Sequence, residues 1–160
     1  MELHAVRKLC EVDEHQLEPT RLMANLKAAW CIAPQQRLQD GRALAALDEA
    51  FHQTLVQATG NLEMSGAFAR LTDRIRIVRR LDFIYGDCVA TTYEEHAAIL
   101  TQIMARQTDE ACRLMALHIE GSHAEVNQIT LHSMHRARTQ AGAQRASSVP
   151  LRVRVGAAKS

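Results

Sequence analysis

Glycine, proline and aromatic residues are scarce in this chain of 160 residues. It contains 7 glycines and 3 prolines, and only 4% of its residues are aromatic. A β-sandwich or β-barrel needs many turn residues and aromatic strands, so this scarcity argues against an all-β fold. Common residue types are instead strong helix formers such as Ala, Leu, Arg, Gln and Glu. The composition therefore predicts an all-α protein.

Paired cysteines and a strong charge of one sign are also missing. Cys10, Cys31, Cys88 and Cys112 form no C-x-x-C pair, which argues against a zinc knuckle or a thioredoxin-like redox site. Scattered thiols are typical of small buried hydrophobes in a reducing compartment. A formal net charge of +1 gives no electrostatic argument for nucleic-acid binding.

Long apolar runs are absent as well. The first residues lack the basic region and apolar run of a secretory signal peptide. Uncharged stretches such as Ala28–Gln36 are far shorter than the ~20 apolar residues of a membrane span. We therefore expect a soluble, cytoplasmic protein that makes no membrane contact.

Apolar residues recur with helical spacing along most of the chain. The expected helices cover residues 2–14, 20–30, 42–59 and 62–82, one that opens at the capping-box pattern of Thr91–Glu94, and a last one over residues 108–137. Gly60 occupies the left-handed position that commonly follows a helix. Residues 1–140 are expected to form one helical domain, and residues 141–160 a basic, largely disordered tail.

Polar residues interrupt three of the apolar faces. Asp48 and His52 are four residues apart, so they are neighbours on the face that also carries Leu44 and Phe51. Two later helices carry one inward histidine each, which are His96 and His118. Three imidazoles and one carboxylate are a suitable ligand set for zinc, nickel, iron or manganese. We expect zinc or nickel.

Simpler explanations of these residues remain open at this stage. A single inward histidine is often a hydrogen-bonded core residue, and Asp48 with His52 can form an ion pair alone. His132 and His135, near the end of the last helix, are expected on the surface. Asn61 is expected to cap a helix end rather than contact a ligand.

Four segments carry more specific patterns. They are Leu3–Glu11, Asp48–Asn61 with D-x-x-F-H followed by G-N, Tyr93–Leu100 with E-H-x-x-I-L, and Ala111–Ile119 with A-x-x-x-M-x-x-H-I. In this order and spacing they resemble the FCD domain, the C-terminal effector-binding domain of FadR-type GntR transcriptional regulators. The resemblance covers roughly residues 1–138.

The resemblance implies an antiparallel bundle of about six helices that binds a metal through Asp48, His52, His96 and His118. It also implies a homodimer in transcription regulation and a small organic acid as effector. Arg7 is our first candidate to bind the acid group and Arg74 our second, because a guanidinium offers a bidentate fork. Either arginine can instead be a surface residue.

The interpretation leaves out one expected module and has two alternatives. The resemblance starts almost at Met1, so we expect DNA contact only through a winged helix-turn-helix that this chain lacks. A structural helical dimerisation module without ligand is one alternative. A metal-dependent hydrolase is another, but Glu49 and Glu95 are expected to point away from the ligands, which leaves no general base. We therefore expect no enzymatic activity.

Overall fold

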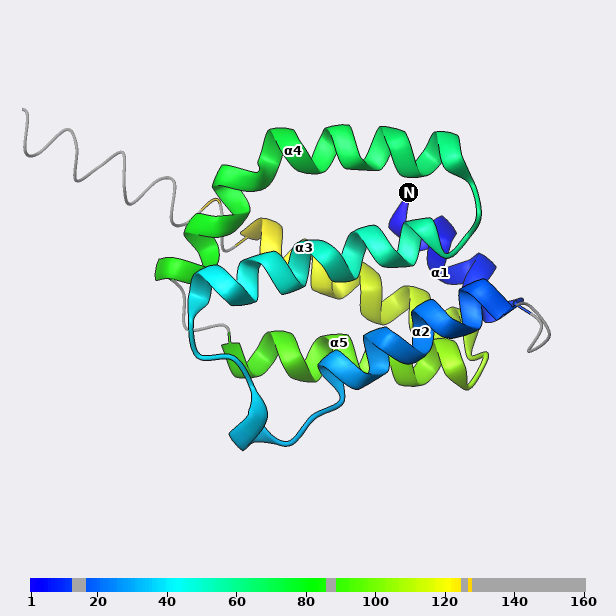
Figure 1. Cartoon of the computed structure of the whole chain (residues 1–160), viewed down its shortest axis with the longest axis horizontal. Helices are drawn as coiled ribbons and strands as arrows, with labels where there is room; N and C mark the ends of the chain where they lie inside the picture. Colours follow the sequence, from blue (N-terminus) through cyan, green and yellow to red (C-terminus); the bar gives the residue numbers. More distant parts are fainter. Residues whose placement is uncertain (13–16, 86–88, 125–126, 128–160) are drawn as a thin grey trace, which may run out of the picture.

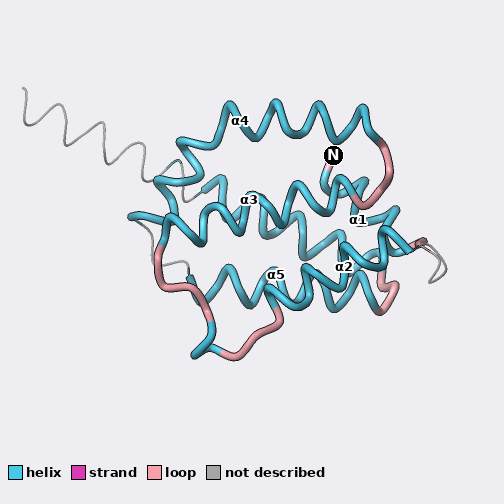
Figure 2. Tube along the Cα trace, viewed as in Figure 1, coloured by secondary structure: helices cyan, strands magenta, loops and turns pink. Residues whose placement is uncertain are grey.

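A computed structural model describes residues 1–12, 17–85, 89–124 and 127. Every regular element within these residues is a helix and none is a strand (Figure 1, Figure 2). No helix in this part of the chain is long and apolar enough to cross a membrane. The expected tail over residues 141–160 lies outside the described residues, as do His132 and His135.

The helices form a bundle. In chain order they are α1 (Glu2–Cys10), α2 (Leu17–Trp30), α3 (Gly41–Gln57), α4 (Leu62–Tyr85) and α5 (Val89–Met104). A short 3-10 helix, Pro34–Gln36, follows α2, and residues 108–124 form a further α-helix, named the last described helix below. Figure 1 shows α3 in the middle of the bundle, between α4 on one side and α2 with α5 on the other.

Local sequence signals set the ends of α3. Asp40 caps its first turn, because the carboxylate accepts hydrogen bonds from two backbone N–H groups at 3.1 and 3.4 Å. After α3, Gly60 adopts the predicted left-handed conformation, with φ of 72°. Asn61 then caps α4 by accepting a hydrogen bond from a backbone N–H at 2.9 Å. The expected role of Asn61 as a cap is therefore confirmed.

Other helix ends differ from the prediction. The first helix ends at Cys10 rather than near residue 14, whereas α4 continues to Tyr85 and α5 already begins at Val89. Thr91 therefore lies inside α5 and is not the N-cap that the capping-box pattern predicted. Val89 packs against the core, and this packing favours an earlier start of the helix than the pattern indicates.

The core lies where α2, α3 and α5 meet. The Trp30 ring meets Phe51 edge-on, with 5.6 Å between ring centroids, and lies tilted against Tyr93 at 4.9 Å. Burial of each large apolar side chain contributes roughly 1.5–3 kcal/mol to folding. Fully buried aliphatic residues around these rings include Leu44, Leu55, Ile99, Leu100 and Met115.

Helical spacing predicts that Ala67, Leu71, Val78 and Leu81 form the inward seam of α4 and that Arg74 lies on it, and this prediction is wrong for Leu71 and Arg74. Leu71 is 45% exposed and Arg74 is exposed, whereas Phe68 and Thr72 are buried. Apolar residues lie all round this helix, and Ile77 is 74% exposed. The sequence alone therefore defines no single apolar stripe, and packing against α3 decides which face is buried.

The described cysteines are free and differ in exposure. Cys10 is buried, and burial raises the pKa of its thiol. Cys112 is half-buried and Cys31 is exposed, while Cys88 lies outside the described residues. The prediction of buried thiols is therefore confirmed for Cys10 and wrong for Cys31.

Candidate metal centre

Helix α3 supplies two of the four predicted ligands. Asp48 and His52 lie one turn apart on the face that packs into the bundle. Both are buried, with 4% and 3% of their surface exposed. Burial of a carboxylate is costly unless a positive charge or hydrogen-bond donors compensate it. Asp48 therefore requires a partner inside the bundle.

The other two ligands come from α5 and the last described helix. His96 is fully buried, and His118 is 5% exposed. The ring of Phe51 stacks on His96 with 3.7 Å between centroids and 7° between planes, and Trp30 meets His96 edge-on at 4.1 Å. These rings restrict the orientation of the His96 imidazole.

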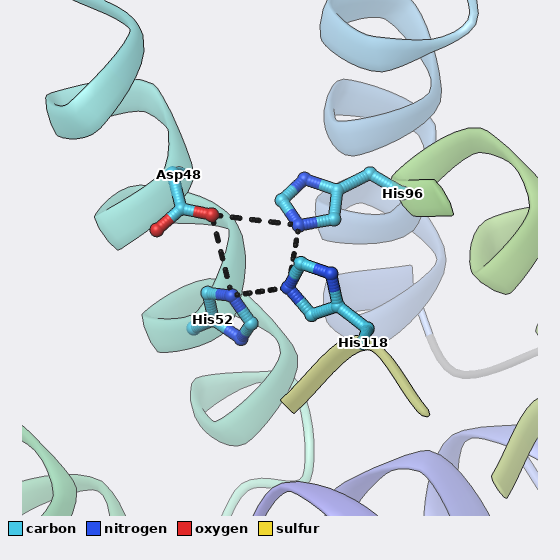
Figure 3. A group of neighbouring side chains, drawn as sticks. All are labelled: Asp48, His52, His96 and His118. Atoms are coloured by element: carbon cyan, nitrogen blue, oxygen red, sulfur yellow. Dashed lines mark hydrogen bonds and ion pairs between the residues drawn. The ribbon is translucent and has the colours of Figure 1, made fainter. Parts of the chain in front are cut away.

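The four side chains face one another and form a closed ring of contacts (Figure 3). The Nε2 atom of His118 lies 3.2 Å from Nε2 of both His52 and His96. Oδ1 of Asp48 lies 3.4 Å from Nε2 of His52 and 3.5 Å from Nε2 of His96. One atom from each residue lies within 4.8 Å of all the others. The fold thus brings together all four predicted residues.

This donor set fits a divalent transition metal. Each zinc–nitrogen distance is about 2.0–2.1 Å, so neighbouring ligand atoms of one ion lie roughly 3 Å apart. The contacts of 3.2–3.5 Å around the ring are close to that spacing. Imidazole nitrogens and a carboxylate oxygen suit several first-row metals. A divalent ion would also compensate the buried charge of Asp48.

Two further carboxylates contact the outer nitrogens of the imidazoles. Glu95 Oε2 lies 2.7 Å from Nδ1 of His118, and Glu2 forms an ion pair with Nδ1 of His52. The expectation that Glu95 points away from the ligands is therefore wrong, because it reaches from α5 to the last described helix. No sequence signal marked either pairing, since both depend on how separate helices pack.

Electrostatic neighbours change the protonation of His52. Burial favours a lower pKa, but Asp48 and Glu2 outweigh burial and raise the pKa of His52 from 6.5 to about 9. Without a metal, His52 is therefore a positively charged imidazolium at neutral pH, with a proton on each ring nitrogen. A metal ion that binds to Nε2 must displace that proton.

Other predicted residues lie apart from the four-residue ring. The side chains of Arg7 on α1 and Arg74 on α4 are exposed, and their role in effector binding stays a prediction. Glu49 does point elsewhere, because it accepts hydrogen bonds from Arg76 of α4 at 3.0 and 2.7 Å. This ion pair links α4 to α3 beside Asp48.

A cavity of about 380 Å³ lies at the carboxyl ends of α1 and α3. Lys8 of α1 lines it together with Glu11, which follows this helix, and with Gln57 and Gly60. None of the four residues of the ring lines this cavity. It is therefore separate from the candidate metal centre.

The FCD domain is the family whose model matches this chain, over residues 1–121. No curated protein matches the chain, and no solved structure matches it. The matched region includes α1 to α5 and all four residues of the ring. The match agrees with the all-α fold. This chain therefore belongs to the FCD domain family, the effector-binding domains of GntR-family regulators.

Proposed function

We propose that this domain senses a small organic acid through a divalent transition metal held by Asp48, His52, His96 and His118. The observation that supports the proposal is the convergence of three imidazole nitrogens and one carboxylate oxygen at a buried point. When bound, the metal would neutralise Asp48 and offer coordination positions to an oxygen of the effector. Zinc and nickel are the expected ions.

The ring joins three helices, which gives the proposal a route to regulation. Its residues come from α3, α5 and the last described helix. An effector that binds one arrangement of these helices more tightly shifts the domain toward that arrangement. We propose that the domain acts as a cytoplasmic homodimer, and that DNA contact is left to a winged helix-turn-helix module.

Metal analysis combined with thermal shifts tests the proposal. Protein purified without a histidine tag should contain stoichiometric metal, and carboxylic acids should raise its melting temperature. Chelator and Asp48→Ala should each abolish the metal-dependent part of that increase. Absence of stoichiometric metal, together with no response to added zinc or nickel, would contradict the proposal and favour a structural helical module.

Arg7 is the first proposed partner of the acid group and Arg74 the second. A guanidinium binds a carboxylate through two parallel hydrogen bonds. Replacement by Gln of the arginine that binds the acid group should weaken effector binding by roughly 10- to 100-fold, which corresponds to the loss of a hydrogen bond between charged groups. Isothermal titration with the effector found in the thermal screen measures this loss.

The matched control for Arg7→Gln is Lys8→Gln, which removes the neighbouring exposed charge on α1. Metal content should stay unchanged in every one of these variants, because neither arginine is a proposed ligand. Equal effector affinity in Arg7→Gln, Arg74→Gln and wild type would remove both arginines from the proposal.

We propose no catalytic role for the centre. A hydrolase would need a free general base near the metal. Glu49 is paired with Arg76, and Glu95 is paired with the outer nitrogen of His118. Turnover of a small ester or amide that is lost in His96→Ala would contradict this part of the proposal.

A further inference from the structure

Two of the four proposed ligands, His52 and His118, have a carboxylate beside the ring nitrogen that faces away from the other ligands. In His118, Nε2 faces the other ligands while Nδ1 lies 2.7 Å from Glu95. In His52, Nε2 faces His118 and Asp48 while Nδ1 is paired with Glu2. Each of these histidines therefore has a carboxylate on its outer side. Figure 3 shows that both imidazoles turn a nitrogen toward the other members of the four-residue ring.

We propose that Glu2 and Glu95 are positioning residues of the metal centre. Each keeps the imidazole hydrogen on Nδ1 of its histidine, so that Nε2 presents its lone pair to the ion. The inference rests on the metal site of the proposed function and adds the residues that determine its affinity.

The chemistry of imidazole supports this assignment. A neutral imidazole has one N–H group and one acceptor nitrogen. A carboxylate only accepts hydrogen bonds, so the nitrogen beside it carries the hydrogen. The opposite tautomer would place the hydrogen on Nε2, facing the other three ligands, and Nε2 could then not bind a metal. Carboxylates in this position also increase the basicity of the ligand nitrogen.

The arrangement of the ring also calls for a cation. When both imidazoles are neutral, with hydrogens on Nδ1, the Nε2 lone pairs of His52 and His118 face each other at 3.2 Å. The Asp48 carboxylate lies a further 3.4 Å from Nε2 of His52. Acceptor atoms at these distances repel one another unless a positive charge lies between them. With the outer carboxylates in place, these acceptor atoms therefore favour a cation between them, either a proton or a metal ion.

His96 is oriented by other means. It is stacked on Phe51 and meets the edge of Trp30. Among the four ligands, His96 is therefore positioned by aromatic packing, whereas His52 and His118 are positioned by carboxylates. The Glu2 side chain is 15% exposed, whereas the Glu95 side chain is 45% exposed. Because water competes less with the more buried contact, Glu2 should have the larger influence.

Glu2→Gln and Glu95→Gln test the proposal by metal affinity. Competition with a chromophoric chelator should show zinc binding weakened about 10- to 100-fold in each, as is typical of such outer partners. The Co²⁺-loaded variants should also show shifted visible absorption bands, which report ligand geometry and which a general loss of stability would not move. The Glu2 variant should lose more affinity than the Glu95 variant.

Matched controls lie on α5 and directly after the end of α1. Glu94→Gln removes the exposed neighbour of Glu95, and Glu11→Gln removes an exposed carboxylate from the end of α1. Both should bind zinc within about twofold of wild type. Far-UV circular dichroism checks that each variant folds, and if Glu2→Gln does not fold, Glu95→Gln decides the outcome.

The outcomes separate this inference from the proposed function. Stoichiometric zinc in wild type with unchanged affinity and spectra in a folded Glu95→Gln variant overturns the positioning role alone. Failure of wild type to bind metal overturns both. Selective loss in the two outer variants, with normal controls, supports the positioning role.

Discussion

His52 is the residue whose protonation most directly links pH to the centre. Its pKa rises to about 9 in the fold from 6.5 as an isolated group. The resulting stabilisation of the metal-free protein is fully present below pH 6.5 and is lost as pH rises through 9. The shift corresponds to about 3 kcal/mol in the free energy of unfolding.

Chemical denaturation in excess chelator measures this effect. The stability advantage of wild type over His52→Gln should be largest near pH 6 and should shrink by pH 9.5. His123→Gln, which removes an exposed histidine outside the centre, is the matched control. A constant advantage of wild type over His52→Gln across this range would contradict the assignment.

Metal affinity should change with pH in the opposite sense. Because one proton must leave His52, affinity should rise about tenfold per pH unit up to about pH 9 and then level off. Calorimetric titration with zinc, in buffers of different ionisation enthalpy, should detect about one proton released per ion near pH 7.5. Release of no proton would show that His52 is already neutral.

The four proposed metal ligands could be predicted from the sequence, whereas the carboxylates that contact two of them could not. Asp48 and His52 follow from helical spacing, because residues four apart share a face. His96 and His118 follow from the apolar residues around them. Glu2 and Glu95 could not be predicted, since an Nδ1 partner from another helix depends on tertiary packing. Helical spacing predicts Arg74 on the inward seam of α4, but its side chain is exposed because packing against α3 buries another face.

At the scale of elements, α3 determines the position of half the ligand set, and Asp40 determines where α3 begins. Asp40→Ala should lower the free energy of unfolding by about 1 kcal/mol, because two first-turn N–H groups lose their acceptor. Asp40→Ser should recover most of that loss, since Ser is also a good N-cap. Urea denaturation measures both variants. A stability equal to wild type in Asp40→Ala would mean that water replaces the cap at no cost.

The turn between α3 and α4 provides a second test of an element boundary. A Cβ at Gly60 would meet no atom within 4 Å, so only its φ of 72° opposes a side chain. Gly60→Ala should therefore destabilise the protein by about 1 kcal/mol, and Gly60→Asn by less, because Asn tolerates this conformation better. Thermal unfolding compares the two. Equal melting temperatures would show that the turn relaxes without strain.

Helix identity was easier to predict than helix packing. Asp40 and Gly60 mark the ends of α3 through local chemistry, which sequence contains in full. The buried face of α4 depends instead on its contact with α3, where Phe68 and Thr72 are covered and Leu71 is not. The early start of α5 has a similar cause, because Val89 packs on the core.

At the scale of the whole molecule, a bound ion would join helices that are distant in sequence. Its proposed ligands lie on α3, α5 and the last described helix. Metal in 100-fold excess over its dissociation constant should stabilise the fold by about 2.7 kcal/mol. Melting temperature should therefore fall after dialysis against chelator and recover with zinc or nickel. His96→Ala should show no such recovery, and a recovery equal to wild type would place the ion elsewhere.

Trp30 gives the bundle an internal optical probe. It is the single tryptophan of the chain, and its ring lies 4.1 Å from that of His96. All intrinsic tryptophan emission therefore originates beside His96, one of the four proposed ligands. Arrival of a paramagnetic ion such as Ni²⁺ should quench that emission, whereas closed-shell Zn²⁺ should mainly shift it. The fluorescence of the unlabelled protein can thus report what the centre contains, in real time and without a dye.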